Sequence, residues 1–123
     1  MADITLPTLA LSIRQPWAAR ILYAGKDIEN RDWDTKVRGD IMIHAGKAFD
    51  TGFVDDWTDP LSEYLLRGGI VGIVEIVDCV TTSDSKWFQG KFGYVLRNPR
   101  PIPLIPCRGV LGFFRPAFGE VAA

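Results

Sequence analysis

The chain has 123 residues, and its 14 Lys and Arg nearly balance its 15 Asp and Glu, giving a formal net charge of −1. This balance argues against a protein that coats nucleic acid by bulk electrostatics, because that mode needs many phosphate contacts. The length predicts one domain over residues 1–123, large enough to bury roughly two-thirds of its unfolded surface. The N-terminus has neither a basic start nor a long apolar run, so we expect no signal peptide, no membrane span and a cytoplasmic protein.

The cysteines and the histidine argue against a metal or redox site. Cys79 and Cys107 are far apart in the sequence, neither belongs to a metal-spacing motif, and His44 is the one histidine. We therefore expect reduced, partly buried thiols, no metal and no cofactor. We also expect a monomer.

The first elements are a strand and a helix. Residues 9–14 (LALSIR) alternate apolar and polar positions, which predicts a strand. Pro16 suits the first position of a helix because its missing amide proton costs nothing there, and Gln15 would cap that helix. We expect the helix to end near Tyr23, with Trp17 on its buried face.

A short charged strand follows the helix. Gly25 allows a sharp turn, and residues 27–31 (DIENR) alternate polar and apolar positions as in an exposed strand. Because successive strand residues point to opposite sides, Glu29 and Arg31 should share one side. Lys26 sits at the turn, close enough to reach over the same side.

The middle of the chain predicts a further strand and two short helices. Residues 40–44 (DIMIH) read as a strand with Ile41 and Ile43 on one face and Met42 and His44 on the other. Apolar residues then recur at helical spacing between acidic ones in segments 49–57 and 60–66. We expect two short helices there, capping one end of the molecule.

The strongest strand signal is the segment 68–82 (GGIVGIVEIVDCVTT), which is rich in β-branched residues and apolar nearly throughout. Within it Glu75 stands out, because an ionised carboxylate is costly to bury unless it is paired or faces a cavity. Glu75 is therefore a candidate functional residue. Residues 92–96 predict a further strand, the four prolines in 97–106 favour an extended edge or connector, and 110–115 closes the sheet.

These elements predict a mostly β fold with short helices (α+β). The architecture we expect is a small β-barrel of five to six strands with an early helix and short capping helices. Periodicity alone leaves an open α+β sheet as the alternative.

Four blocks of sequence carry a resemblance to a known family. They are SIRQPW (residues 12–17), GKDIENR (25–31), RGDIMIHA (38–45) and RGVLGFF (108–114). Together they resemble the ASCH domain, the ASC-1 homology domain of the PUA-like superfamily, as a small stand-alone member of bacterial type. The family signature G-x-K-x-x-E-x-R falls on Lys26, Glu29 and Arg31, but its first glycine falls on Ala24, with Gly25 in the variable position. That departure concerns the geometry of the turn.

The resemblance implies a PUA-like barrel with a cleft that binds RNA or a nucleoside. Arg and Lys would hold phosphate, a carboxylate would accept from a base amine, and aromatic rings would stack on bases. The residues we expect to bind the ligand are Arg14, Gln15, Trp17, Lys26, Glu29, Arg31, Trp33, His44 and Tyr94. The basic residues also predict a positive rim around the pocket if those of the first half of the chain, Arg14, Lys26, Arg31, Lys36, Arg38 and Lys47, face the same side as Arg97, Arg100 and Arg108.

Two alternatives remain open. Some small bacterial ASCH proteins are amidohydrolases that deacylate N4-acylated cytidine, and the resemblance then assigns catalysis to Lys26, Glu29 and Glu75. Glu29 stands where such enzymes carry a nucleophilic threonine, so water would attack instead, with Glu29 as general base and Lys26 or Arg31 stabilising the oxyanion. The second alternative is a protein-interaction module.

Overall fold

The two longest strands, β4 (Gly69–Val80) and β5 (Phe92–Pro106), pair antiparallel and form the central wall of the fold. The computed structural model describes residues 6–48 and 60–118 of the chain. The first six residues of β4 are all buried, as its β-branched sequence predicts. The register between β4 and β5 shifts at three points, and such bulges bend a strand pair and increase its twist.

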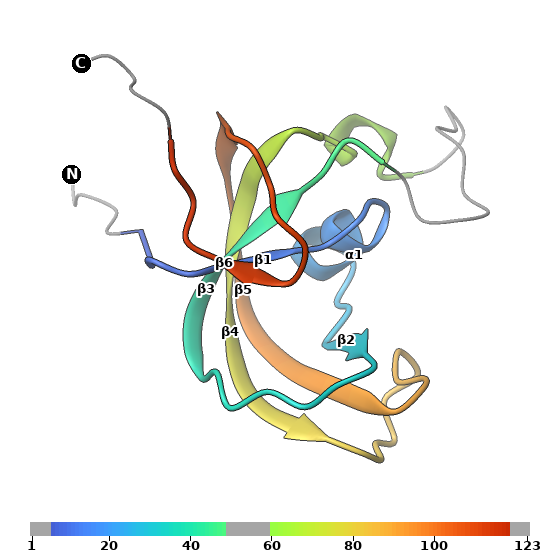
Figure 1. Cartoon of the computed structure of the whole chain (residues 1–123). Coiled ribbons are helices and arrows are strands. Elements are labelled where there is room, and N and C mark those ends of the chain that lie inside the picture. Colours follow the sequence, from blue (N-terminus) through green and yellow to red (C-terminus); the bar gives the residue numbers. More distant parts are fainter. Residues whose placement is uncertain (1–5, 49–59, 119–123) are drawn as a thin grey trace.

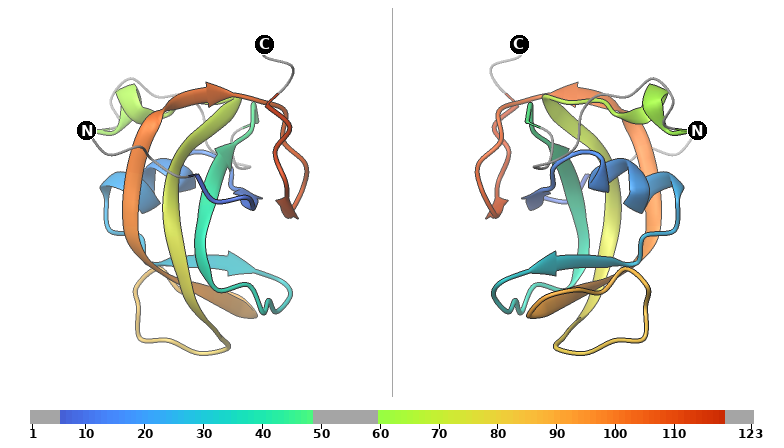
Figure 2. Two further views of the ribbon diagram at one scale, coloured as in Figure 1. Left: turned by 90° about the vertical axis from the view of Figure 1, so that its left-hand side faces the viewer. Right: turned by 90° about the vertical axis from the view of Figure 1, so that its right-hand side faces the viewer.

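This bent pair is the middle of one six-stranded sheet that curls into a half-barrel (Figures 1 and 2). The strand order is β2-β5-β4-β3-β1-β6, and β1 and β3 pair parallel whereas the other neighbours pair antiparallel. The remaining strands are β1 (Ala10–Ser12), β2 (Ile28–Arg31), β3 (Gly39–Ala45) and β6 (Phe113–Phe114). The structure confirms the expected fold, which is mostly β and consistent with a small PUA-like barrel.

The proline-rich half of β5 lies on an edge, in agreement with the sequence. β2 pairs only with the segment from Phe92 to Val95. Beyond it, β5 pairs with β4 alone, so the prolines remove no hydrogen bond from a central ladder.

The α-helix α1 (Trp17–Tyr23), the one such helix in the described part of the chain, packs against β3, β4 and β5. The helix begins one residue later than expected, with Pro16 as its N-cap rather than its first residue, but Gln15 Oε1 still accepts a hydrogen bond from the Ala19 amide at 2.9 Å. The helix ends at a turn in which Gly25 has φ of 75°, a left-handed conformation that suits glycine. Gly25 therefore makes the turn that the family signature would place one residue earlier.

The expected capping helices are corrected in part. Segment 49–57 lies outside the described residues, whereas segment 60–66 contains only a 3₁₀ turn, η1 (Ser62–Tyr64). A single turn is too short to be stable as a helix by itself. The Leu66 carbonyl instead accepts a hydrogen bond from Gln15 Nε2 at 2.8 Å.

β3 separates two hydrophobic clusters, as its alternation predicts. Ile41 and Ile43 belong to the main core with α1, whereas Met42 belongs to a smaller cluster with Ala10 and Ile70. Phe114 and Phe118, from the end of the chain, pack on the smaller cluster. Both faces of β3 are therefore covered by apolar residues.

Substitution of Gly69 tests the close pairing of β4 and β5. A Cβ at Gly69 would overlap the carbonyl group of Ile105, whereas a Cβ at Gly46 would meet nothing within 4 Å. We expect Gly69→Ala to lower the free energy of unfolding by about 1–3 kcal/mol, because backbone must move. Urea unfolding of Gly69→Ala and of the control Gly46→Ala measures this, and equal losses in the two variants would contradict it.

Candidate functional site

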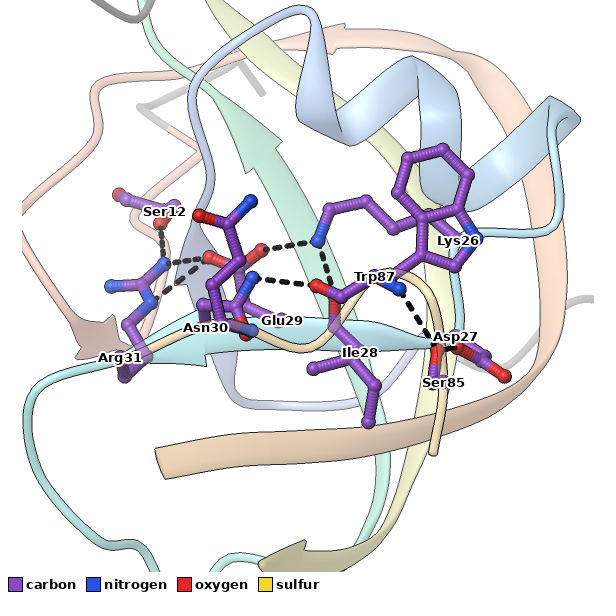
Figure 3. A network of polar contacts seen from close by, with 10 residues as sticks. Ser12, Lys26, Asp27, Ile28, Glu29, Asn30, Arg31, Ser85 and Trp87 are labelled. Carbon is purple, nitrogen blue, oxygen red and sulfur yellow. Dashed lines mark hydrogen bonds and ion pairs between the residues drawn. The ribbon is translucent and has the colours of Figure 1, made fainter. Parts of the chain in front are cut away.

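A network of ionised side chains lies along β2 (Figure 3). Arg31 Nε donates to Glu29 Oε2 at 3.0 Å, and Arg31 Nη2 donates to the Ser12 carbonyl at 2.5 Å. Lys26 Nζ lies 3.9 Å from Glu29 Oε1 and donates to the Ile28 carbonyl. Glu29 and Arg31 therefore share one side of β2, as the alternation predicts, and Lys26 joins them in one network from the turn before the strand.

The network is buried. Lys26 is 5% exposed and Glu29 8%, so neither charge is fully hydrated. Burial lowers the pKa of the Lys26 ammonium, and the attraction of the Glu29 and Asp27 carboxylates opposes this shift without cancelling it. Lys26 therefore releases its proton more readily than an exposed lysine.

Two indole rings flank the Lys26 ammonium. Nζ lies 5.7 Å from the ring centroid of Trp17 and 5.8 Å from that of Trp87. A cation at this distance from an aromatic face is attracted by the ring quadrupole. The two rings therefore help to stabilise the charge that burial disfavours.

Hydrogen bonds between the β2 region and the loop of residues 83–90 hold Trp87 beside β2 (Figure 3). Asn30 Nδ2 donates to the Trp87 carbonyl and Asn30 Oδ1 accepts from the Gln89 amide, both at 2.9 Å. Ser85 Oγ donates to Asp27 Oδ1 at 2.5 Å. Sequence analysis missed Trp87, although a tryptophan in the polar segment 83–90 (SDSKWFQG) is a usable signal.

The network opens onto a cleft of about 1420 Å³. Three tryptophans line it, Trp17, Trp33 and Trp87. Its lining also contains six basic residues, Arg14, Lys26, Arg31, Lys47, Lys86 and Arg108, against the two carboxylates of Glu29 and Asp32. The cleft is therefore both aromatic and predominantly cationic.

Seven of the nine residues expected to bind a ligand line this one cleft. They are Arg14, Trp17, Lys26, Glu29, Arg31, Trp33 and His44. They come from α1, β2, β3 and the segments that connect β1, α1, β2 and β3. Trp33 is 59% exposed, so its ring is available to a ligand.

Gln15 and Tyr94 do not line the cleft, which corrects their assignment to it. Gln15 is fully buried, and its amide group bonds to Ala19 and Leu66. Tyr94 is also fully buried, and its hydroxyl donates to the Trp33 carbonyl at 3.0 Å. Burial raises the pKa of the Tyr94 hydroxyl. Both side chains support the fold near the cleft.

The expectation that Glu75 meets Lys26 and Glu29 is wrong. Val74 and Ile76 belong to the main core, so Glu75 between them points to the other face of β4. There it accepts a hydrogen bond from Arg97 Nε at 3.0 Å, across the β4–β5 ladder. Glu75 is paired on the outer face of the sheet.

The expected positive rim is also only partly formed. Lys47 and Arg108 line the cleft, but Lys36, Arg38, Arg97 and Arg100 do not. Arg100 Nη2 donates to Asp40 at 2.6 Å, beside the Glu75–Arg97 pair. Arg38 lies 3.8 Å from Asp78. These arginines form ion pairs away from the cleft.

No helix in residues 6–48 and 60–118 is long and apolar enough to cross a membrane. Within the same residues, His, Cys, Asp and Glu form no group of three or more suited to a metal ion.

Comparison with known proteins identifies the family. The model of the ASCH domain matches residues 11–99, which include α1, β2, β3, β4 and the network on β2. Comparison with curated protein sequences gave no match. Because the matched segment is well over half of the chain, the protein belongs to the ASCH domain family of the PUA-like superfamily.

Proposed function

We propose that this ASCH protein binds single-stranded RNA in the cleft beside β2. ASCH domains are thought to bind RNA. The observation that carries the proposal is the lining of one cleft by three tryptophans and six basic residues. Stacked bases and a phosphate chain need these two kinds of side chain together.

The size of the cleft favours a short chain of nucleotides over a free nucleoside. Pockets for small molecules usually have volumes of about 300–1,000 Å³, and this cleft has about 1420 Å³. A single nucleoside would leave much of the lining uncovered. A segment of a few nucleotides would use the whole surface.

Different side chains of the cleft would contact different parts of the RNA. Arg31 and Lys26 are engaged with Glu29 and keep the wall of the cleft in place. Lys47, Lys86 and Arg108 are exposed and can reach phosphates. Trp33 offers an exposed ring on which a base can stack.

Trp33→Ala tests stacking. We expect it to weaken binding of a fluorescently labelled single-stranded RNA roughly fivefold to 100-fold in fluorescence anisotropy, because one base loses its stacking partner. The control is Tyr23→Ala, which removes an exposed ring outside the cleft lining. Unchanged affinity in Trp33→Ala, or an equal loss in Tyr23→Ala, would show that the cleft is not where RNA binds.

Arg108→Ala tests the phosphate contacts. Loss of one phosphate contact should lower the slope of log affinity against log salt by about 0.7 for a single strand. The matched control is Arg97→Ala, whose arginine pairs with Glu75 away from the cleft. Titrations of RNA at several salt concentrations measure both slopes, and we expect a change only in Arg108→Ala.

A second candidate function is deacylation of N4-acylated cytidine, and the lowered pKa of Lys26 favours it. A neutral Lys26 can take a proton from the water that attacks the acyl carbonyl, and the resulting ammonium can return it to N4 as the C–N4 bond breaks, which releases cytidine and the free acid. Glu29 Oε1, 3.9 Å away, would orient the amine. The distal carboxylate expected at Glu75 has no part in this scheme, because it lies on the outer face.

Incubation with N4-acetylcytidine tests this second function. If Lys26 is the base, release of cytidine should rise with pH through a pKa below 10.5, because only the neutral amine accepts a proton. Lys26→Ala should abolish the activity and Glu75→Ala should leave it unchanged. If the rate instead falls as the pH rises through this pKa, the charged ammonium is the active form, and Lys26 would stabilise the oxyanion rather than act as the base. No deacylation and no RNA binding at micromolar protein would favour an interaction module.

A further inference from the structure

The loop between β5 and β6 has an exposed apolar tip. Leu111 is 87% exposed and Val110 57%, and within residues 6–48 and 60–118 no other large apolar side chain is as exposed as Leu111. Both line the cleft, as does the exposed ring of Trp33. The other exposed large apolar side chains of that part of the chain lie outside the cleft lining, namely Tyr23, Tyr64 and Leu66. A single exposed leucine is ordinary, but exposed apolar side chains gathered at one cleft indicate a contact surface.

Hydrogen bonds fix the backbone of this loop on both sides of its tip. Ser12 Oγ donates to the Val110 carbonyl at 2.6 Å, and the Ser12 amide donates to the Gly112 carbonyl at 3.1 Å. Leu111 lies between these two carbonyls, so its side chain is exposed by a bonded loop conformation. Before the tip, the Cys107 amide donates to the Gly68 carbonyl at 3.2 Å. A loop that is already ordered loses little conformational freedom when a ligand binds.

Two chains of contacts connect this loop to the segment that carries Trp33. Phe113 follows the tip, and its ring stacks on Tyr94 with the centroids 6.0 Å apart, while the Tyr94 hydroxyl donates to the Trp33 carbonyl. Ser12, which holds the tip, accepts at its own carbonyl from Arg31 on β2. Figure 2 shows the loop before β6 and the segment after β2 on the same side of the half-barrel. Leu111 and Trp33 are therefore two exposed apolar groups of one cleft whose backbones are tied together.

The charges near the tip favour a nucleotide over an apolar peptide as the occupant. Arg108, at the start of the loop, is exposed and lines the cleft, and the lining as a whole is predominantly cationic. An apolar peptide would leave these cations without anionic partners. A nucleotide offers a phosphate and an apolar base face in one unit. Leucine is among the side chains that proteins insert between neighbouring bases.

We propose that Leu111 is a wedge that packs on a base next to the one stacked on Trp33, while Arg108 of the same loop contacts the adjoining phosphate. This inference rests on the proposed binding of single-stranded RNA and names the contact that would hold its bases apart. With Leu111 inserted between them, the two bases do not stack on each other. The cleft would then accept bases that are unpaired and unstacked, as in a single strand.

The first test changes the wedge. We expect Leu111→Ser to weaken binding of labelled oligouridine in fluorescence anisotropy roughly threefold to tenfold, because apolar contact with a base is lost. The slope of log affinity against log salt should stay unchanged, because no phosphate contact is lost. Leu111→Phe keeps an apolar face and should bind at least as tightly as the wild-type protein.

The matched control is Leu66→Ser, which changes an exposed leucine outside the cleft lining. Thermal unfolding followed by circular dichroism checks that each variant is folded. Undiminished affinity in folded Leu111→Ser, or an equal loss in Leu66→Ser, would overturn the wedge. If Trp33→Ala weakens binding and Leu111→Ser does not, RNA binding in the cleft stands without it. If the wild-type protein binds no oligouridine, both proposals are overturned.

The second test changes the ligand. A strand of the same length in which tetrahydrofuran spacers replace the nucleosides keeps the phosphates but has no bases. We expect Leu111→Ser and the wild-type protein to bind this abasic strand equally, whereas Arg108→Ala should bind both strands more weakly than the wild-type protein does. Loss of affinity by the same factor for both strands in Leu111→Ser would show that Leu111 contacts the backbone, and would overturn the inference.

Discussion

The fold and the cleft both depend on how Glu29 is buried. An ionised carboxylate taken out of water costs several kcal/mol unless it is paired, and Glu29 is paired by Arg31 at 3.0 Å with Lys26 at 3.9 Å. Arg31 also donates to the Ser12 carbonyl. Three strands separate β2 from β1 in the sheet, so this guanidinium joins two parts of the half-barrel that no backbone ladder joins. Removal of the charge of Glu29 or of Arg31 would therefore weaken the pairing of the buried ions that remain, and it would also loosen the barrel.

The cleft lies at this junction for the same reason. Where strands do not pair, backbone carbonyls need other partners, and here the Ser12, Ile28 and Val110 carbonyls accept from the side chains of Arg31, Lys26 and Ser12. Long polar side chains can bridge such a gap while leaving space beside them. The ionised residues of the site thus help to connect the strands at the open side of the sheet. The cleft is the space beside these side chains that they do not fill.

Local alternation predicted which residues of β2 meet, because in a strand Glu29 and Arg31 must share a face whatever the rest of the chain does. Glu75 obeys the same rule, but a sequence does not reveal which face of a curled sheet is concave, and its partner Arg97 lies 22 residues away. Trp87 was missed because its place beside Lys26 depends on contacts between distant parts of the chain, such as the bond to Asn30, 57 residues earlier. The local alternation of the sequence was therefore enough to predict the network on β2. The rest of the cleft depends on contacts between residues far apart in the chain, which a local pattern does not reveal.

The near-zero net charge of the chain is compatible with a cationic cleft because the charges are segregated. On the outer face, Asp40 pairs with Arg100 and Glu75 with Arg97, so these groups largely cancel one another locally. Screening limits the reach of exposed charges to about 8–10 Å at physiological salt, so a ligand in the cleft interacts with the cleft lining rather than with the total charge. Since Lys26 and Arg31 already neutralise Glu29, fewer than six cations remain for phosphates. Such a site suits a short single strand held largely by stacking, and its affinity should depend on salt less steeply than that of a protein that coats nucleic acid.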